Sequence, residues 1–313
     1  MCSGKWVRHA VVGVIGALVV SLSASAALAD KTKHVLIIGI DGAMPDAVKA
    51  AKAPNLKALA ADGAVSWDAF AGGVLGTPSR QNTASMASWH SIITGVWANK
   101  HKGARMLRGQ PVPADHVSYP TMFQRLKSHD GAARSVCISN WPIITQVMAP
   151  GATFKARGAG DAKVVELAKK ELAENTPTLM FLQLDEVDGA GHANNYGPKI
   201  PKYLEAIEQA DKHVGEIVAA VKARKTYANE EWLIIAVTDH GGTKDPKGPG
   251  GVHGGDSPQE RKAFIIVSGA AAKKGEVTPG PGITAVAPTA LAFLGIKIAP
   301  QWNLDAKPFG LKE

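Results

Sequence analysis

The sequence has few of the features that mark disulfide-stabilised, membrane-spanning or nucleic-acid-binding proteins. Only two of its 313 residues are cysteines, and Cys2 lies in an N-terminal leader, so Cys137 has no partner for a disulfide in the mature chain. After the leader, no apolar run approaches the roughly 20 residues that a spanning helix needs. The net charge of +8 comes from scattered basic residues, which fits small anionic substrates better than a nucleic acid polymer.

The leader, residues 1–29, has the pattern of a secretory signal peptide. Lys5 and Arg8 precede the apolar run 10–22, and Ala27-Leu28-Ala29 forms an A-x-A cleavage site before Asp30. An uncleaved membrane anchor is the alternative, but the run is short for it. Cys2 lacks the leucine-rich context of a lipoprotein signal. We therefore expect a secreted or periplasmic protein with a single domain over residues 30–313 and no stable membrane anchor, and the oligomeric state stays open.

Apolar runs of strand length alternate with helical patterns along the mature chain. Continuous apolar runs are typical of strands that are covered on both faces, as in parallel sheets. We therefore predict an α/β fold, doubly wound, with a mainly parallel central sheet and helices on both faces. Two poorly periodic regions, 95–130 and 241–262, are candidate lids. The predicted strands are 34–40, 134–139, 178–184, 232–238 and 263–268, and the principal helices are 45–62 with a break near Pro54, a helix starting near Ser85, 164–172, 201–225 and 288–294.

Carboxylates and imidazoles follow several of these runs. Because the carboxyl ends of parallel strands meet at one edge of a sheet, we expect these side chains to lie together. Oxygen and nitrogen donors without thiolates favour Zn²⁺, with Mn²⁺ or Fe as second choices. Six side chains suffice for two ions, which at about 4 Å separation can stabilise the attacking and leaving oxygens of a phosphoryl displacement. The six are Asp41, Asp188, His192, Asp239, His240 and His253.

Ser85 is a candidate nucleophile for that displacement. A serine hydroxyl is weak at neutral pH and needs a base or a metal ion to activate it. At the start of a predicted helix, Ser85 would also let backbone N–H groups face a phosphate. From the pattern alone, an ordinary helix N-cap is the commoner explanation of this serine.

In their order along the chain, these motifs resemble the alkaline phosphatase superfamily, and within it the type I phosphodiesterase/nucleotide pyrophosphatase branch. The resemblance implies one zinc ion held by Asp188, His192 and His253, and a second held by Asp41, Asp239 and His240. It also implies that Ser85, nine residues before Thr94, is the nucleophile and meets the second ion, with Thr83 as its nearest rival. The matching segments are Asp41-Gly42, 91–101, Asp188-x-x-x-His192, Asp239-His240-Gly241-Gly242, His253 and 287–295.

The function that this resemblance implies is a secreted two-metal phosphoesterase. It would hydrolyse a phosphodiester or pyrophosphate-type bond of a small substrate through a covalent phosphoseryl intermediate. The alternatives are a phosphomonoesterase or phosphonate hydrolase on the same site, and a non-catalytic protein that binds metal or ligand on a retained fold.

Other positions qualify the resemblance. Segment 76–80 resembles a sulfatase signature, but Gly76 stands where the cysteine precursor of formylglycine would be. Ser88 stands where relatives often have a phosphate-binding Asn. Ser88, Trp89, Asn140 and Tyr196 are the candidate substrate contacts, although aromatic and amide side chains in such places are more often packing residues.

Overall fold

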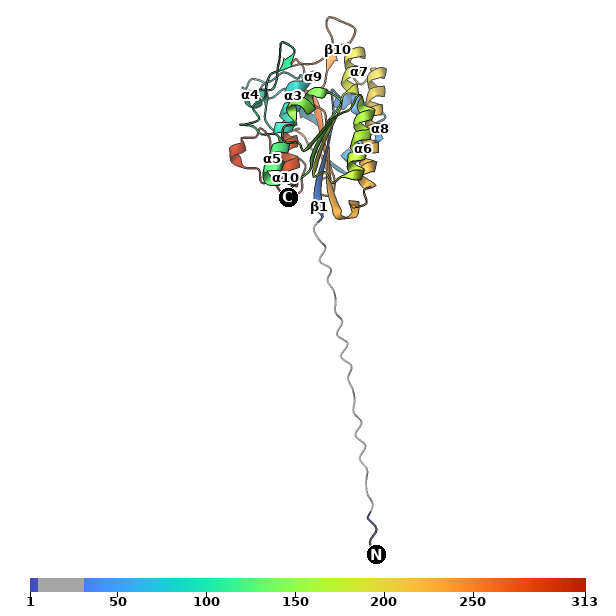
Figure 1. Cartoon of the computed structure of the whole chain (residues 1–313). Helices are drawn as coiled ribbons and strands as arrows, with labels where there is room; N and C mark the ends of the chain where they lie inside the picture. The colour runs from blue at the N-terminus through green and yellow to red at the C-terminus, as the bar shows by residue number, and fades with distance from the viewer. Residues whose placement is uncertain (5–30) are drawn as a thin grey trace. The chain divides into compact units, whose positions relative to one another are not determined.

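A computed structural model describes residues 1–4 and 31–313 of the chain (Figure 1). The predicted cleavage site and nearly all of the predicted signal peptide therefore lie outside the described residues. Residues Lys31–Glu313 form one compact unit. Within the described ranges, no helix has the length and apolar character needed to cross a membrane.

The unit is built on an eight-stranded sheet in the order β12-β2-β11-β8-β1-β7-β5-β6. All neighbouring pairs are parallel except those of β11, which runs antiparallel to both β8 and β2. This confirms the prediction of a mainly parallel sheet. The strands are β1 (Thr32–Ile40), β2 (Gly63–Phe70), β5 (Ser135–Ser139), β6 (Phe154–Arg157), β7 (Leu179–Leu184), β8 (Glu230–Val237), β11 (Lys262–Ser268) and β12 (Gly275–Glu276).

Helices cover both faces of this sheet, because successive strand residues point to opposite faces and both sets are apolar. In β1, Leu36 and Ile38 join one core cluster while Val35 and Ile37 join the other. Full burial of each such side chain contributes about 1.5–3 kcal/mol. One face carries α1 (Pro45–Ala50), α2 (Pro54–Ala61), α6 (Asp161–Glu174) and α8 (Pro201–Lys222), and the other carries α3 (Ser85–Thr94), α5 (Met122–His129) and α10 (Val286–Phe293).

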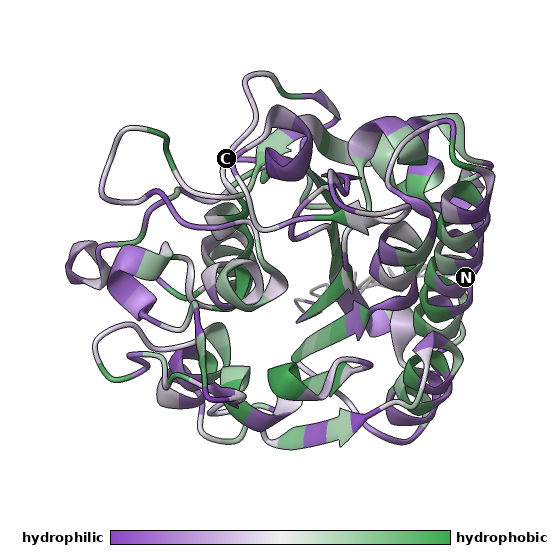
Figure 2. Cartoon of the chain, turned by 90° about the horizontal axis from the view of Figure 1, so that it is seen from above, coloured by the Kyte–Doolittle hydropathy of each residue, from purple (hydrophilic) through white to green (hydrophobic). Residues whose placement is uncertain are grey.

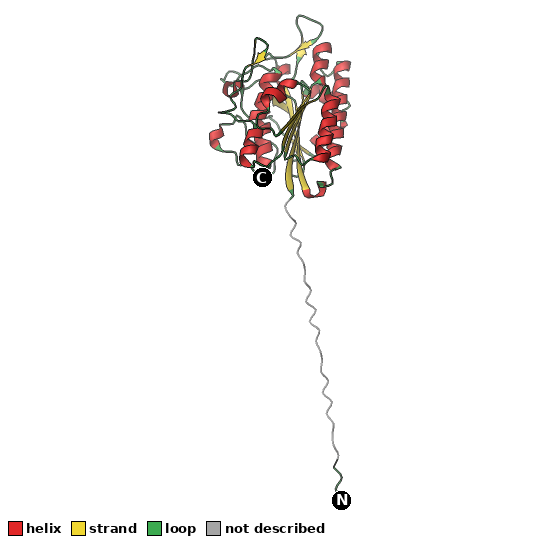
Figure 3. Cartoon of the chain, in the orientation of Figure 1, coloured by secondary structure: helices red, strands yellow, loops and turns green. Residues whose placement is uncertain are grey.

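Figures 1 and 3 show α6 and α8 on one side of the strands and α3, α5 and α10 on the other. From above, the central strands are mostly green for hydrophobic residues, while the outer helices mix green with purple (Figure 2). This distribution is expected of helices that pack one face on a sheet and turn the other to water. The doubly wound α/β architecture is therefore confirmed.

Most predicted elements are present within a few residues of their expected bounds. The predicted break near Pro54 separates α1 from α2, and Pro54 is the first residue of α2. The poorly periodic regions contain α4 (Ala98–His101), α9 (Pro258–Arg261) and two small hairpins. The hairpins pair β3 (Met106–Leu107) with β4 (Gln110–Pro111) and β9 (Thr243–Lys244) with β10 (Gly251–Val252). Whether these regions act as lids stays a prediction.

Several elements were not predicted, among them β6, β12 and the small elements of the poorly periodic regions. Strand β2 was missed, and so was α7 (Glu186–Asn194), whose Gly189 and Gly191 weaken a helical pattern. Helix α7 begins two residues after β7 ends. It therefore lies at the same edge of the sheet as the carboxyl ends of β1 and β8, where the site is found.

Candidate active site

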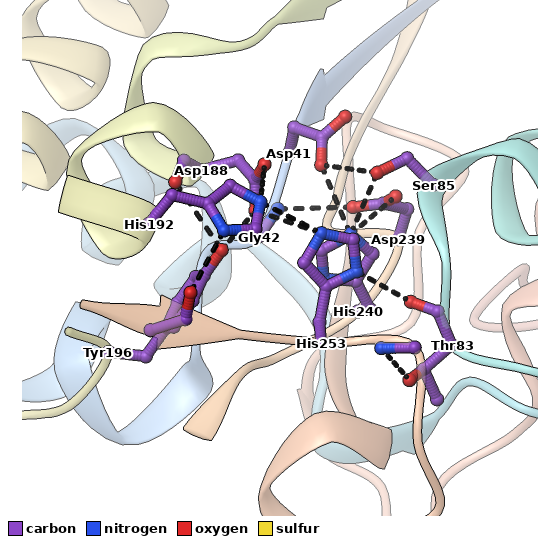
Figure 4. Close-up of polar contacts among 12 residues, drawn as sticks. Asp41, Gly42, Thr83, Ser85, Asp188, His192, Tyr196, Asp239, His240 and His253 are labelled. Atoms are coloured by element: carbon purple, nitrogen blue, oxygen red, sulfur yellow. Dashed lines mark hydrogen bonds and ion pairs between the residues drawn. The ribbon is translucent and has the colours of Figure 1, made fainter. Parts of the chain in front are cut away.

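All six predicted metal ligands meet at the carboxyl edge of the sheet, in two groups of three. Asp41 follows β1, Asp239 and His240 follow β8, Asp188 and His192 lie on α7, and His253 follows β10. Within each group, one ligand atom per residue lies within 4.8 Å of the others. We name Asp41, Asp239 and His240 the inner set, and Asp188, His192 and His253 the outer set (Figure 4).

The inner set is fully buried. His240 Nε2 lies 3.3 Å from Asp41 Oδ1 and 3.3 Å from Asp239 Oδ2. The other oxygen of Asp239 accepts a hydrogen bond of 3.1 Å from the backbone N–H of Gly42, whereas Oδ2 makes no hydrogen bond. Burial of a carboxylate is costly unless a cation or hydrogen-bond donors compensate for its charge. The inner set therefore needs positive charge.

The outer set is more open to solvent. The four-residue spacing of Asp188 and His192 places them one above the other on α7, and His192 Nε2 lies 3.2 Å from Asp188 Oδ2. His253 Nε2 approaches to 3.1 Å from His192 Nε2 and 3.7 Å from Asp188 Oδ1. The rings of His253 and His240 stack with centroids 3.8 Å apart, so the two sets adjoin.

Backbone carbonyl groups orient all three imidazoles. The Nδ1 atoms of His192, His240 and His253 lie 3.0, 2.8 and 3.2 Å from the carbonyl oxygens of Gly251, Gly241 and Thr83. A carbonyl oxygen only accepts, so each Nδ1 carries a proton, and Nε2 is the nitrogen of each ring that is left to bind a metal ion. Where both lack a proton, the two Nε2 atoms 3.1 Å apart in the outer set repel unless a cation lies between them. These orientations fit metal ligation.

The pKa shifts show the same demand for a cation. Burial and the charge of Asp41 raise the pKa of Asp239 well above its usual range. Burial lowers the pKa of His240, but the carboxylates of Asp239 and Asp41 outweigh this and raise it to about 10. Burial would raise the pKa of Asp188, yet its hydrogen bond with His192 and the nearby histidines hold it below the usual range. The residues present therefore fit the implied metal ions.

Ser85 presents its hydroxyl to side chains of the inner set. It is half-buried at the first position of α3. Its Oγ lies 3.3 Å from Asp41 Oδ1 and 3.0 Å from His240 Nε2. The rival, Thr83, is fully buried, and its hydroxyl donates to the carbonyl of Gly255 at 2.9 Å. The geometry therefore favours Ser85 over Thr83.

The four predicted substrate contacts have other surroundings. Ser88 and Trp89 are 0 % exposed, and whether either contacts substrate stays a prediction. The Trp89 indole donates to Asp41 Oδ2 at 2.8 Å. The Asn140 amide donates to Asp161 Oδ1 at 2.9 Å, and the Tyr196 hydroxyl donates to Asp188 Oδ1 at 2.6 Å. The polar groups of Trp89, Asn140 and Tyr196 therefore hold carboxylates.

Gln183, a buried residue near the end of β7, was not among the predicted site residues. Its Nε2 donates to Asp41 Oδ2 at 3.1 Å and to Asp185 Oδ1 at 2.7 Å. Its Oε1 accepts from the backbone N–H of Trp141 at 2.9 Å, which fixes the orientation of the amide. The available signal was a single polar residue within an otherwise apolar strand.

The fold, with two groups of three possible metal ligands beside a serine, is typical of a metal-dependent hydrolase of the alkaline phosphatase superfamily. A family model for "Type I phosphodiesterase / nucleotide pyrophosphatase" matches residues 113–278, more than half of the chain. The chain belongs to this metal-dependent family and is a phosphoric ester hydrolase.

Solved structures show the same fold. Murine ectonucleotide pyrophosphatase/phosphodiesterase 5 superimposes with a TM-score of 0.65 at 15% identity, covering 85% of this chain and 96% of that one. A 2-O GAG sulfatase gives 0.67 at 13% identity, covering 86% and 72%. A phosphonate monoester hydrolase from Silicibacter pomeroyi gives 0.63 at 15% identity, covering 88% and 76%. No curated protein sequence matches the chain.

Proposed function

We propose that the protein is a two-metal phosphodiesterase, acting on a phosphodiester or pyrophosphate-type bond of a small substrate through a phosphoseryl intermediate. The observation that carries this proposal is the position of Ser85 Oγ, 3.3 Å from Asp41 Oδ1 and 3.0 Å from His240 Nε2, beside two sets of three ligands. The inner set would hold one ion and the outer set the other, with Zn²⁺ favoured by the mixed oxygen and nitrogen donors.

The chain's own groups account for most of the reaction. When bound, the two ions would supply positive charge that favours the Ser85 alkoxide and stabilises charge on the phosphoryl oxygens. Ser85 Oγ attacks phosphorus, and the bond from phosphorus to the leaving oxygen breaks. Water then hydrolyses the phosphoserine and restores the serine. No side chain caps the N-terminus of α3, so N–H groups of its first turn can donate to the phosphoryl oxygens.

In the part of the chain that the structure describes, the lack of lysine and arginine contacts at the site favours a phosphodiester substrate over a phosphomonoester. None of the hydrogen bonds or ion pairs that the seven site residues form within the described chain involves lysine or arginine. A monoester dianion carries one more negative charge than a diester, and among the described residues no lysine or arginine contacts the seven site side chains to balance it. An inactive variant of the murine relative binds AMP, and we extend this to a nucleotide-type substrate here.

A sulfatase activity is disfavoured although sulfatases share the fold. Gly76 stands where a sulfatase has the cysteine that becomes formylglycine, and a glycine cannot supply that nucleophile. The phosphomonoesterase and phosphonate hydrolase alternatives use the same metal sets, so only turnover separates them from the diesterase. The similarity to a phosphonate monoester hydrolase is a similarity of fold.

Metal analysis of the purified mature protein tests the site. We expect about two divalent ions per chain, and we expect Ser85→Ala to abolish turnover while retaining them. Thr83→Ser, which keeps a hydroxyl at the rival position, is the matched control and should stay active. Wild-type turnover in Ser85→Ala would remove Ser85 from the mechanism.

A substrate panel tests the specificity. Bis-aryl phosphate and a nucleotide diester should be hydrolysed faster than aryl monophosphate and phosphonoacetate at equal concentrations. Preference for the monoester or the phosphonate would favour the corresponding alternative. Metal binding without turnover of any member would favour the non-catalytic alternative.

We also propose that the protein is exported to the periplasm or secreted, on the evidence of the leader sequence. Expression of the full chain in a bacterium should yield a mature protein whose first residue is Asp30. N-terminal sequencing of the exported fraction would identify that residue, and an intact N-terminus would contradict cleavage.

A further inference from the structure

Trp89 lies against the carboxylate of the inner set. It is one turn along α3 from Ser85 and fully buried, and its indole Nε1–H donates to Asp41 Oδ2 at 2.8 Å. The opposite oxygen, Oδ1, faces His240 Nε2 and Ser85 Oγ, each at 3.3 Å. Gln183 adds a second hydrogen bond to Oδ2. The donors therefore hold Asp41 with one oxygen turned toward the nucleophile.

Tyr196 has the corresponding place in the outer set. It is 6 % exposed, and its hydroxyl donates to Asp188 Oδ1 at 2.6 Å (Figure 4). The other oxygen, Oδ2, faces His192 Nε2 at 3.2 Å. A carboxylate oxygen only accepts, so the Tyr196 hydroxyl is the donor in this contact. Each set therefore contains an aspartate whose two oxygens have different neighbours.

Glycines leave the space that both aromatic rings fill. A Cβ at Gly39 in β1 would lie 2.3 Å from the Trp89 ring. For Tyr196, a Cβ at Gly191, Gly242 or Gly251 would lie 2.1, 2.4 or 2.4 Å from the ring. These three glycines come from α7, from the loop after β8 and from β10. A ring surrounded by backbone on several sides has little freedom to move, which fixes the direction of its donor.

We propose that Trp89 and Tyr196 are positioning residues, one for each metal set, that fix the orientation of Asp41 and Asp188. Hydrogen bonds to ligating carboxylates orient them, and loss of such a bond typically costs 10–100-fold in metal affinity or activity. This inference rests on the proposed two-metal function. It assigns to both residues a role distinct from substrate contact, since neither ring is open to solvent.

The test measures the affinity of the mature protein for Zn²⁺ by competition with a chelator. Tyr196→Phe removes the hydroxyl oxygen and should lower the affinity for one of the two ions about 10–100-fold. Trp89→Phe removes the N–H that donates to Asp41 and should lower the affinity for one ion by a similar factor. It should also reduce kcat and leave KM nearly unchanged. Combining Trp89→Phe with Tyr196→Phe should lower the affinity for both ions, because the two residues orient carboxylates of different sets.

The chain supplies a matched control for each variant. Trp232, at the opposite end of β8 from the site, is buried and donates its Nε1–H to Glu230 Oε2 at 2.8 Å. Tyr203 is buried and donates its hydroxyl to the carbonyl of Gly42, and among the described residues no hydrogen bond joins it to a ligand carboxylate. Trp232→Phe and Tyr203→Phe should lower the melting temperature while both ions bind as in the wild-type protein.

Three results would count against the assignment. Folded Tyr196→Phe and Trp89→Phe that bind both ions with wild-type affinity would overturn it, and so would control variants that lose affinity equally. If Trp89→Phe does not fold, Gln183→Leu removes the other donor to Asp41, and Tyr196→Phe alone still decides the outer set. Wild-type protein that binds no Zn²⁺ would overturn the proposed function itself, and this is seen before any variant is compared.

Discussion

The contribution of a single ligand to metal binding can be tested at His253. His253 comes from the loop after β10, and its Nε2 faces both other members of the outer set, at 3.1 Å from His192 Nε2 and 3.7 Å from Asp188 Oδ1. His253→Ala should therefore reduce the metal content from about two ions toward one, by a larger factor than the 10–100-fold typical of a supporting residue. Elemental analysis after dialysis measures this. His129→Ala, at an exposed histidine, is the control, and equal losses in both variants would contradict the assignment.

Cys137 offers a second test at the scale of one residue. Its side chain is fully buried in β5, and burial raises the pKa of the thiol to about 12. Because the thiolate is the reactive form, the folded mature protein should not react with a thiol reagent at pH 8, and denaturant should expose one reactive thiol. The uncleaved chain is the control, since its exposed Cys2 should react at once. Rapid labelling of the folded mature protein would contradict the burial of Cys137.

Secondary-structure elements differ in how much of their placement the sequence predicts. Strands β1, β7 and β8 are continuous apolar runs because helices cover both of their faces, so burial and sequence pattern agree. Helix α7 was missed because two glycines interrupt it. The antiparallel direction of β11 could not be predicted, because an apolar run has the same pattern in either direction. Direction depends on the connections and on the neighbouring strands.

The amino end of β8 carries a buried ion pair that stabilises the fold at the edge away from the site. Arg224 donates to Glu230 at 2.8 and 2.9 Å. Burial raises the pKa of Glu230, but hydrogen bonds from Arg224, Thr226 and Trp232 outweigh it and lower the pKa to about 2. A lowered folded pKa stabilises the protein above the unfolded value near 4.5, and this contribution is lost as the pH falls toward 2.

Glu230→Gln should therefore lower the free energy of unfolding at pH 7 by on the order of 3 kcal/mol. The difference from the wild type should shrink between pH 4.5 and pH 2. Urea unfolding at several pH values measures both effects. Glu205→Gln, at an exposed pair with Lys202, should change the free energy of unfolding by less than about 1 kcal/mol. If the free energy of unfolding of Glu230→Gln stays below that of the wild type by a constant amount down to pH 2, the lowered pKa of Glu230 is contradicted.

For the molecule as a whole, the sequence predicts the ligands better than the residues that support them. Asp41, Asp239 and His240 follow apolar strands, and parallel strands bring such ends to one edge whatever the loops do. The roles of Trp89 and Tyr196 depend on which side chains the folded backbone brings within 3 Å, and sequence spacing does not contain that information. Ser88 and Trp89 were assigned to substrate for this reason, and packing buries both.

The same ligand sets should couple metal binding to the stability of the whole domain. Asp41 and Asp239 are buried side by side, and among the described residues their hydrogen bonds and ion pairs involve His240, polar neutral side chains and the backbone of Gly42 but no lysine or arginine. A cation that binds only the folded state stabilises it by about 4 kcal/mol when its free concentration is 1,000 times its dissociation constant. In a domain of this size, each kcal/mol shifts the melting temperature by about 2–4 °C.

Removal of metal with a chelator should therefore lower the melting temperature by on the order of 10 °C, and added Zn²⁺ should restore it. Calorimetry of the mature protein with and without chelator measures the shift. Ser85→Ala should show the same shift, because it keeps all six ligands. A variant with Asp188→Asn and His253→Ala should show a smaller one, because only the inner set remains complete. If the chelator leaves the wild-type melting temperature unchanged, the buried carboxylates are compensated by protons in place of metal ions, and the two-metal assignment fails.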